Sequence, residues 1–145
     1  MIKVRNILET KKLPLFTTTG DTMVYDALKM MKENNIGAVV VMEKEKFIGI
    51  FTERDYARKV VLLARASRFT PVKDIIVQAY YMISPEDSIE HCMNLMVGKS
   101  VHYLPVFENK RFVGIISIGD VVKCVIDYQK DIIEQLDNYI SGAKS

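Results

Sequence analysis

Cysteine is scarce in this sequence, and its positive and negative charges nearly cancel. The two cysteines, Cys92 and Cys124, both fall inside apolar helical patterns. Because a disulfide scaffold needs several suitably spaced cysteines, we expect free thiols and a reducing compartment, the cytoplasm. The formal net charge is +2, which is too small to indicate a nucleic-acid partner.

Long apolar runs are also missing. No stretch approaches the roughly 18 apolar residues of a membrane span. The opening "MIKVRNILETKK" lacks the apolar core of a signal peptide, and we expect no membrane partner. Apolar residues still make up 49% of the 145 residues, and 26% are charged. This composition favours one compact, cooperative unit with a buried core.

Basic residues are present but unevenly spread. Five of them fall within fifteen positions, namely Arg54, Arg58, Lys59, Arg65 and Arg68. One interpretation is a solvated helix face followed by a loop. The other is that one or two of these side chains meet an anion. The sequence leaves both open.

The most informative feature is an internal repeat. A shift of 65 positions lays residues 21–61 on 86–126 without a gap. "FIGIFTERD" at 47–55 then meets "FVGIISIGD" at 112–120, so that a glycine, a hydroxyl and an aspartate recur at the same spacing. These residues are Gly49, Thr52 and Asp55 in the first copy, and Gly114, Ser117 and Asp120 in the second. A long gapless register that keeps this spacing is hard to obtain by chance.

Each repeat predicts the same elements. Apolar residues at i, i+3, i+4 and i+7 from Val24 and from Ile89 predict an amphipathic helix in each half, capped by Asp21–Thr22 or Asp87–Ser88. "AVVVM" with "FIGIFT", and "YLPVF" with "FVGIIS", predict hairpins, and short extended pieces, "LFTTT" and "YYMIS", precede the helices. A second helix begins near Arg54 or Gly119. The fold class is mixed α/β (α+β), with two such units packed sheet to sheet.

The boundaries follow from the repeat. "VRNIL" at 4–8 echoes "VKDII" at 72–76, so each half is expected to begin with its own lead-in segment. We place the first repeat at 1–66, with its core at 15–62. The second is placed at 67–145, with its core at 79–127 and a C-terminal helix to about 140. The stretch "LLARASRFTP" at 62–71 reads as the linker between them.

The C-terminal helix is longer than the second repeat needs. Its apolar stripe comprises Val122, Val125, Ile132, Ile133, Leu136 and Ile140. This stripe either folds back on the chain or covers a partner chain, because a long apolar stripe left in water is costly. We expect a homodimer.

The recurring aspartates have two interpretations. At the end of a strand and the start of a helix, a hydroxyl and free N–H groups favour a phosphate, and a carboxylate three residues on can accept bonds from the vicinal hydroxyls of a ribose. A nucleotide would satisfy both groups. A threonine and an aspartate at such a turn can equally be a helix cap, although two copies in matched register weaken that explanation.

"IGAVVV" with "GIFTERD", and "LPV" with "GIISIGD", resemble the motifs of tandem cystathionine-β-synthase (CBS) domains. This family of paired modules, also called Bateman modules, senses adenosine nucleotides, and the resemblance is closest to stand-alone prokaryotic pairs over about residues 1–128. It implies two β-α-β-β-α units forming one pseudo-twofold module. It also implies a regulatory function that signals to a partner, with ligands in clefts between the repeats. The expected ligand is AMP, ADP, ATP or NAD, with S-adenosylmethionine ranked lower.

The resemblance also implies site residues. Asp55 and Asp120 match the ribose position, and Thr52 and Ser117 match the phosphate-side hydroxyl. The segments lining the base and phosphate ends are Ile36, Gly37 and Ala38 in the first repeat, and Val101, His102 and Tyr103 in the second. Glu53, Arg54, Ile118 and Gly119 complete the candidate nucleotide-binding set.

The two candidate sites differ. The first repeat has Arg54 where the second has Gly119, and Val40 where the second has the family's Pro105. The additional cation makes the Arg54 site our first choice for a phosphorylated ligand.

A catalytic centre is not expected. His91 and His102 lack a cysteine or aspartate at a spacing that suggests catalysis or metal binding, so we predict no enzyme, no metal and no catalytic cofactor. The alternative to a ligand sensor is a module of the same fold that only dimerises or docks a partner. The regulated protein cannot be named from the sequence.

Overall fold

The computed structural model describes residues 2–11, 15–76 and 80–143. They form two compact units. The first-repeat unit covers the described residues between 15 and 80, and the second-repeat unit combines residues 2–11 with 81–143. Each unit is described by itself.

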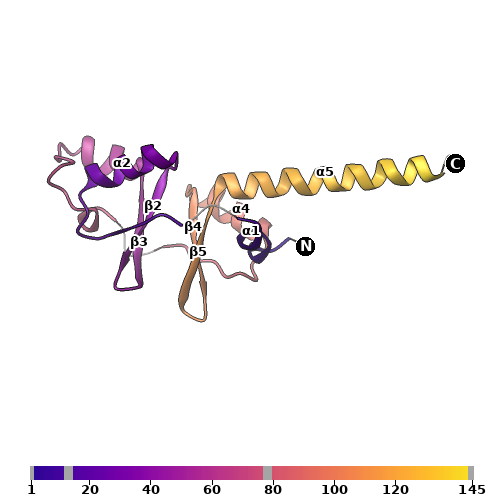
Figure 1. The fold of residues 1–145 in the computed structure, drawn as a ribbon, viewed down its shortest axis with the longest axis horizontal. Coiled ribbons are helices and arrows are strands. Elements are labelled where there is room, and N and C mark those ends of the chain that lie inside the picture. Colours follow the sequence, from indigo (N-terminus) through magenta and orange to yellow (C-terminus); the bar gives the residue numbers. More distant parts are fainter. Residues whose placement is uncertain (1, 12–14, 77–79, 144–145) are drawn as a thin grey trace. The chain divides into compact units, whose positions relative to one another are not determined.

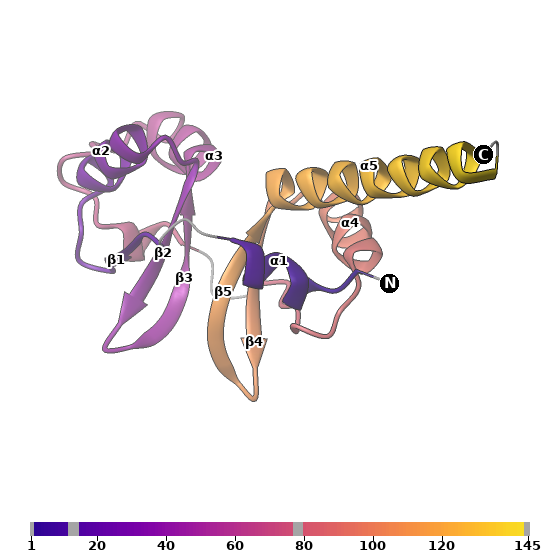
Figure 2. The same cartoon turned by 45° about the vertical axis from the view of Figure 1, so that its right-hand side comes forward.

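The first-repeat unit is a three-stranded sheet with helices, drawn in violet and magenta in Figures 1 and 2. In chain order it contains β1 (Thr17–Thr19), α2 (Val24–Asn34), β2 (Ala38–Glu43), β3 (Lys46–Thr52), α3 (Glu53–Asp55), the π-helix η1 (Tyr56–Val61) and the 3-10 helix η2 (Val72–Asp74). The strand order is β1-β2-β3, with β1 parallel to β2 and β2 antiparallel to β3. The predicted β-α-β-β-α order is confirmed.

The second-repeat unit repeats this plan with a smaller sheet. It contains α1 (Val4–Thr10), α4 (Ile89–Gly98), β4 (Tyr103–Glu108), β5 (Arg111–Ser117) and α5 (Ile118–Ala143). β4 and β5 pair antiparallel. The extended piece expected in "YYMIS" is reduced to one parallel bridge between Ile83 and Val106. The predicted hairpins and the extended C-terminal helix are confirmed.

Both hairpins close with the same tight turn. Lys44 and Glu45 have φ of 50° and 67°, and Asn109 and Lys110 have φ of 52° and 65°. Two consecutive positive φ angles between paired strands define a type I′ turn, whose twist matches that of the flanking strands. The turns within "EKEK" at 43–46 and "ENK" at 108–110 therefore have the same geometry in both repeats.

Each unit buries the stripe that the helical periodicity predicted. Val24, Ala27 and Met31 join β2 and β3 residues in one core. Ile89, Cys92 and Met96 join β4 and β5 residues in the other. The helix side chains named here are almost completely buried. Apolar burial of this kind is the main force that holds such a unit together.

The lead-in segments are exchanged between the repeats, so the expectation that each half begins with its own is wrong. Val4 and Ile7 of α1 lie in the core of the second-repeat unit. Val72 and Ile75 lie in the core of the first-repeat unit. Both segments carry the same apolar spacing, so the pattern suits either core and could not decide between them. The boundaries at 66 and 67 stay a prediction about the repeat along the chain.

Equivalent ion pairs accompany the exchange. Arg5 contacts Glu86 in the second-repeat unit, and Lys73 contacts Asp21 in the first, with N–O distances of 2.6 and 2.7 Å. Hydrogen bonding to Glu86 raises the pKa of Arg5, and hydrogen bonding to Asp21 raises the pKa of Lys73. Exposed pairs of this kind contribute little stability, so apolar burial holds the segments.

Only one of the two predicted helix caps is present. Ser88 Oγ accepts from His91 N at 3.1 Å and caps α4. α2 has no side-chain cap. The carbonyls of Thr70 and Ser67 accept from Val24 N and Tyr25 N instead. The linker therefore packs on the start of α2, a contact distant in sequence that local pattern could not reveal.

Candidate functional site

The turn between β3 and the following helix is a reciprocal cap. Thr52 Oγ1 accepts from Asp55 N at 3.0 Å, and Asp55 Oδ2 accepts from Thr52 N at 3.0 Å. Each side chain satisfies the other residue's backbone N–H at a point where the helix cannot. The helix-cap interpretation of this spacing is therefore correct for the first repeat.

The second repeat contains the same arrangement. Ser117 Oγ accepts from Asp120 N at 3.1 Å, and Asp120 Oδ2 accepts from Ser117 N at 2.9 Å. The hydroxyl and aspartate thus recur because each strand-to-helix junction is closed by the same pair of hydrogen bonds.

A lysine approaches each aspartate, but from a different part of the sequence. Lys59 Nζ lies 3.3 Å from Asp55 Oδ1, and it comes four residues later in the chain, in η1. Lys11, just after α1, donates to Asp120 Oδ2 and to the carbonyl of Ile115, both at 2.9 Å. The repeat equivalent of Lys59 is Cys124, which cannot supply a cation. The exchanged lead-in therefore provides the charge at the second junction.

The recurring glycines let those lead-in segments approach the strands. A Cβ at Gly49 would collide with Tyr80 Oη and lie 2.9 Å from Ile76 Cδ1. A Cβ at Gly114 would lie 2.9 Å from Leu8 Cδ2. Both glycines therefore lie where a neighbouring side chain of the protein passes close to the strand backbone.

Tyr80 is part of this contact in the first repeat. Its hydroxyl accepts from Ile50 N at 3.0 Å, and its ring packs edge-on against Phe47 with centroids 5.5 Å apart. Burial raises the pKa of Tyr80 to about 12, with the charge of Asp55 adding to the shift. Tyr80 thus packs on β3.

Main-chain bonds join the other predicted site segments to the caps. In the first repeat, Glu53 N donates to Gly37 O at 3.1 Å. In the second, Ile118 N donates to His102 O at 2.9 Å. Ala38 pairs with Thr52, and Tyr103 pairs with Ser117, in the two hairpins. The structure therefore brings residues 36–38 to 52–55, and 101–103 to 117–120. Their role in nucleotide binding stays a prediction.

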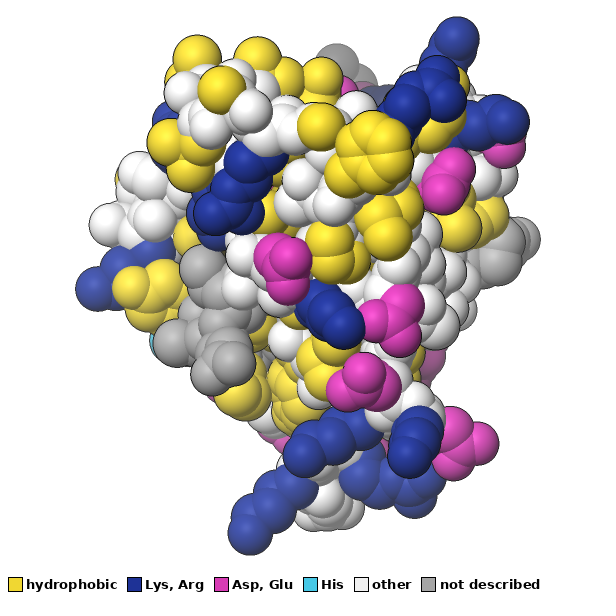
Figure 3. All heavy atoms as spheres, turned by 90° about the vertical axis from the view of Figure 1, so that its left-hand side faces the viewer, with side chains coloured by type: hydrophobic (Ala, Val, Ile, Leu, Met, Phe, Trp, Pro, Cys, Tyr) yellow, Lys and Arg dark blue, Asp and Glu magenta, His cyan; other side chains and the backbone are white. Residues whose placement is uncertain are grey.

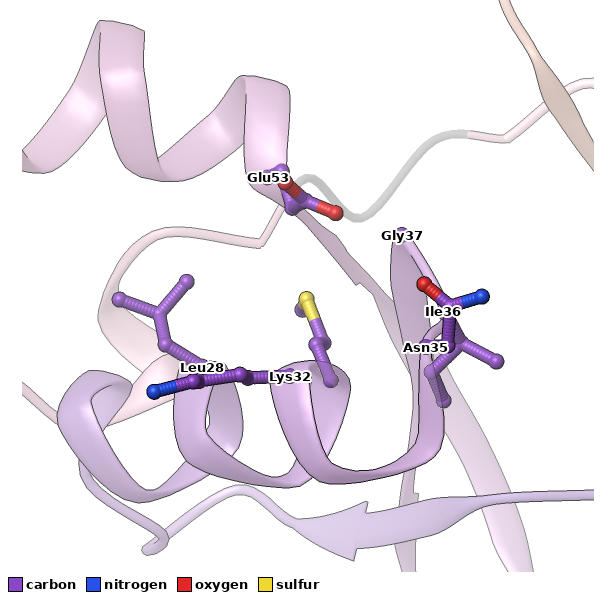
Figure 4. Close-up of a pocket in the computed structure, with 7 residues that line it drawn as sticks. Leu28, Lys32, Asn35, Ile36, Gly37 and Glu53 are labelled. Carbon is purple, nitrogen blue, oxygen red and sulfur yellow. The ribbon is translucent and has the colours of Figure 1, made fainter.

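A cavity of about 430 Å³ opens at one side of the first-repeat junction (Figure 4). Its lining residues are Leu28, Met31, Lys32, Asn35, Ile36, Gly37 and Glu53. In Figure 4, Glu53 lies at the start of α3, across the opening from Leu28 and Lys32 on α2. The volume lies in the range of small-molecule sites. Ile36, Gly37 and Glu53 were predicted as site residues, whereas the α2 side was missed because its residues read as an ordinary helix.

The predicted basic cluster is partly engaged. Arg68 lies over the ring of Tyr25 at 4.2 Å, and Lys59 contacts Asp55. On the face in Figure 3, several Lys and Arg side chains gather at the lower end, and over the rest of the face they alternate with acidic and hydrophobic ones. Arg54 is exposed and lies between Thr52 and Asp55 of the first cap in the sequence, and its contact with a phosphate stays a prediction.

The described parts of the chain contain neither a cluster of metal-ligating side chains nor a cysteine with a lowered pKa. No three His, Cys, Asp or Glu side chains gather there to hold a metal ion. Burial raises the pKa of Cys92 to about 11 and also raises that of Cys124, so both remain neutral thiols near pH 7. Over those same residues, no helix combines the length and apolarity needed to cross a bilayer.

Comparison with known proteins identifies the family. The family model for the CBS domain matches residues 4–62 and 72–127. The chain belongs to the CBS-domain family and carries two of its units.

Relatives and solved structures agree with this assignment. The chain is 40% identical over 133 residues to the mitochondrial CBS domain-containing protein CBSX3 of Arabidopsis thaliana, covering 88% of this chain and 64% of that protein. A Burkholderia ambifaria structure, named for signal transduction and CBS domains, is 42% identical with a TM-score of 0.82, covering 87% and 95% of the two chains. A hexameric CBS-CP12 protein from bloom-forming cyanobacteria is 26% identical with a TM-score of 0.70, covering 84% and 70%. These names indicate no catalytic family.

Proposed function

We propose that the chain is a regulatory module that binds an adenosine nucleotide at its strand-to-helix junctions and signals to a partner protein. The observation that carries this proposal is the matched pair of junctions. In each repeat a hydroxyl, an aspartate and the segment before the inner strand are held together by hydrogen bonds. The ligand class follows from family membership together with these residue types.

The caps do not use up the carboxylates. An ionised carboxylate offers about four acceptor positions on its two oxygens. Asp55 uses one for Thr52 N and lies near Lys59, and Asp120 uses one for Ser117 N and one for Lys11. The two side chains remain 21% and 23% exposed. A ribose hydroxyl can therefore bind to a carboxylate that its own cap has already positioned.

The first-repeat junction is the better candidate for a phosphorylated ligand. Lys32 and Glu53 line the cavity that opens there (Figure 4), and the exposed Arg54 follows Glu53 directly in the chain. At the second junction Gly119 replaces the arginine, and Lys11 already contacts Asp120. A ligand at the second junction must compete with Lys11 or bind beside it.

A thermal-shift panel tests the proposal. AMP, ADP, ATP, NAD and S-adenosylmethionine are each added to the full chain, with inosine monophosphate as the control for the base. A ligand that binds only the folded state raises the melting temperature, by an amount that grows with the logarithm of the ligand concentration above its Kd. We expect at least one of the first four to do so. No shift with any of them at millimolar concentration would contradict the proposal.

A second candidate function is a dimerising or docking module that binds no nucleotide. The caps favour it, because they explain the repeated motif without a ligand. The exposed apolar face of α5 favours it as well. The thermal-shift panel separates the two functions, since a module that only docks a partner gives no response to any nucleotide.

We also propose that the chain acts as a homodimer in the cytoplasm. The exposed apolar residues of α5 support association, and the hexameric CBS-CP12 protein shows that a relative assembles from several copies. The regulated partner is a protein still to be identified. We expect the homodimer to signal through direct contacts with that protein.

A further inference from the structure

The C-terminal helix presents an apolar face to solvent over most of its length. Val121 is buried in the second-repeat core, and Cys124 and Val125 pack against it. From residue 126 to residue 142 every side chain is exposed. Figures 1 and 2 show this part of α5 extending past α1 and α4 with no other element of its unit beside it. An isolated helix of this length is marginal in water, so a cover is required.

Apart from Tyr128, the large apolar residues of the exposed part fall on a seven-residue repeat that also includes Gln129. Ile126, Ile133 and Ile140 form one row, Gln129 and Leu136 a second, and Ile132 and Tyr139 a third. We call these seven residues the α5 stripe. A strict seven-residue repeat keeps an apolar seam in contact with another long helix over several turns, whereas packing on a globular surface does not need it. The period therefore indicates a helical partner.

Charge selects a second copy running in the opposite direction. The charged residues of the exposed part all lie off the stripe, and they are Asp127, Lys130, Asp131, Glu134 and Asp137. In a parallel pair in register, each acidic residue would lie level with its own copy. An antiparallel pair centred at Glu134 places Lys130 within one residue of the level of Asp137 of the second copy, twice. It also opposes the two helix dipoles. Such pairs add little affinity but decide orientation.

The register follows from the exposed segment itself. When the segment 126–142 is overlaid on an antiparallel copy of itself, the midpoint of the overlap is Glu134. This places Ile132 level with Leu136 of the second copy, and Gln129 level with Tyr139. The two polar members of the stripe thus meet each other, and Ile132 and Leu136 meet near the centre. Ile133 lies one residue from the twofold axis, so that the two copies of Ile133 are about two residues, or roughly 3 Å, apart along the pair.

We propose that α5 is a self-association element, in which the α5 stripes of two copies pair antiparallel about Glu134. This names the face and geometry of the proposed homodimer and stands whether or not a nucleotide binds. Cover by another part of the same chain is the competing explanation, and it predicts a monomer.

The first test measures mass. Sedimentation velocity of the full chain at tens of micromolar compares the parent with Ile133→Asp and with Asn138→Asp, which adds the same charge off the stripe. We expect Ile133→Asp to halve the mass of the parent assembly and Asn138→Asp to leave it unchanged. A monomeric parent, or an Ile133→Asp variant with the parent's mass, would overturn the proposal. Circular dichroism confirms that each variant is folded.

The second test measures orientation and does not require a disruptive change. In a Cys124→Ser background, Tyr139→Cys alone should not cross-link, because the two thiols lie about ten residues or roughly 15 Å apart along the antiparallel pair. A disulfide needs Cα atoms within about 7 Å. Mixing Tyr139→Cys with Gln129→Cys should give a mixed disulfide dimer under mild oxidation. Efficient self-linking of Tyr139→Cys would show a parallel pair and overturn the assignment.

Discussion

At the scale of single residues, the two aspartates have a structural task that exists without any ligand. Asp55 and Asp120 each close a strand-to-helix junction through a bond from the backbone N–H three residues earlier. A substitution there will therefore affect stability whatever the function is. Structural and binding effects can still be separated, because the cap needs an oxygen acceptor and the ribose bond gains from a charge.

This separation gives the first prediction. Asp55→Ala should lower the free energy of unfolding by about 1 kcal/mol, since the bond from Thr52 N is lost. Asp55→Asn keeps a carbonyl oxygen at the same place and should remain close to the parent. Urea denaturation of the three proteins measures this difference. If the asparagine variant is destabilised as much as the alanine variant, the contact with Lys59 matters more than the cap.

Tyr80 provides a prediction about pH. Its folded-state pKa of about 12 lies above the ordinary 10.0, mainly because of burial. Burial favours the neutral phenol, so its contribution to stability is complete below about pH 10 and is lost as the pH rises towards 12. Tyr80→Phe removes this titration and also leaves Ile50 N without its acceptor. We expect the variant to be less stable at pH 8 and to lose less further stability between pH 9 and 11.

The control for Tyr80→Phe is Tyr81→Phe, because Tyr81 is exposed. Chemical denaturation at a series of pH values compares both variants with the parent. A parent curve parallel to that of Tyr80→Phe over this range would show that Tyr80 does not titrate with a raised pKa.

Arg54 tests the inequality of the two junctions. A charge-assisted bond from its guanidinium to a phosphate is worth roughly 1.5–3 kcal/mol when well formed. Arg54→Ala should therefore weaken ADP or ATP by about ten- to a hundredfold and adenosine much less. Calorimetric titration of both ligands measures the difference, with Arg58→Ala as the control on the same face. Equal losses for adenosine and ATP would mean that Arg54 does not contact the phosphate.

At the scale of helices and strands, the local sequence pattern predicted an element correctly where its buried residues recur at regular spacing. The spacing of Val24, Ala27 and Met31 predicted both the helix and its buried face, and the paired apolar runs predicted both hairpins. Pattern failed where the deciding contact is distant in sequence. The cap of α2 comes from the carbonyls of Ser67 and Thr70. The π-helical turn at Tyr56–Val61 has no local signal that we recognised.

The exchanged lead-in segments give the prediction that belongs to this scale. Val4 and Val72 are both fully buried, each in the core of the repeat that does not follow it directly in sequence. Val4→Ala should increase hydrogen exchange in α4, and Val72→Ala should increase it in α2. Each change removes two methyl groups from a packed core, so a loss of about 1–3 kcal/mol is expected.

Hydrogen exchange followed by mass spectrometry of peptides reads the two helices separately. The two variants act as controls for each other, since each should leave the other helix close to the parent. Equal effects of Val4→Ala on α2 and α4 would show that the two cores unfold together, and an effect on α2 alone would contradict the exchange.

At the scale of the whole molecule, the repeat allowed the sequence to predict more than one motif could. The register placed the hydroxyl, the aspartate and the segment before the inner strand at equivalent positions, and the structure brings these together in both units. The cation beside each aspartate could not be predicted in the same way. Lys11 reaches Asp120 from the opposite end of the sequence, whereas Lys59 lies beside Asp55 at the first junction.

The central claim is that these junctions bind an adenosine nucleotide, and calorimetric titration of AMP, ATP and NAD tests it most directly. The parent, Asp55→Ala and Asp120→Ala are titrated, and their melting curves are recorded alongside. Loss of a carboxylate that holds a ribose diol costs roughly 2–4 kcal/mol, or about thirty- to a thousandfold in affinity. We predict that the parent binds at least one of these ligands, and that at least one variant stays folded and loses it. If both variants melt earlier yet bind every ligand as the parent does, or if the parent binds none, the aspartates are caps alone and the claim is wrong.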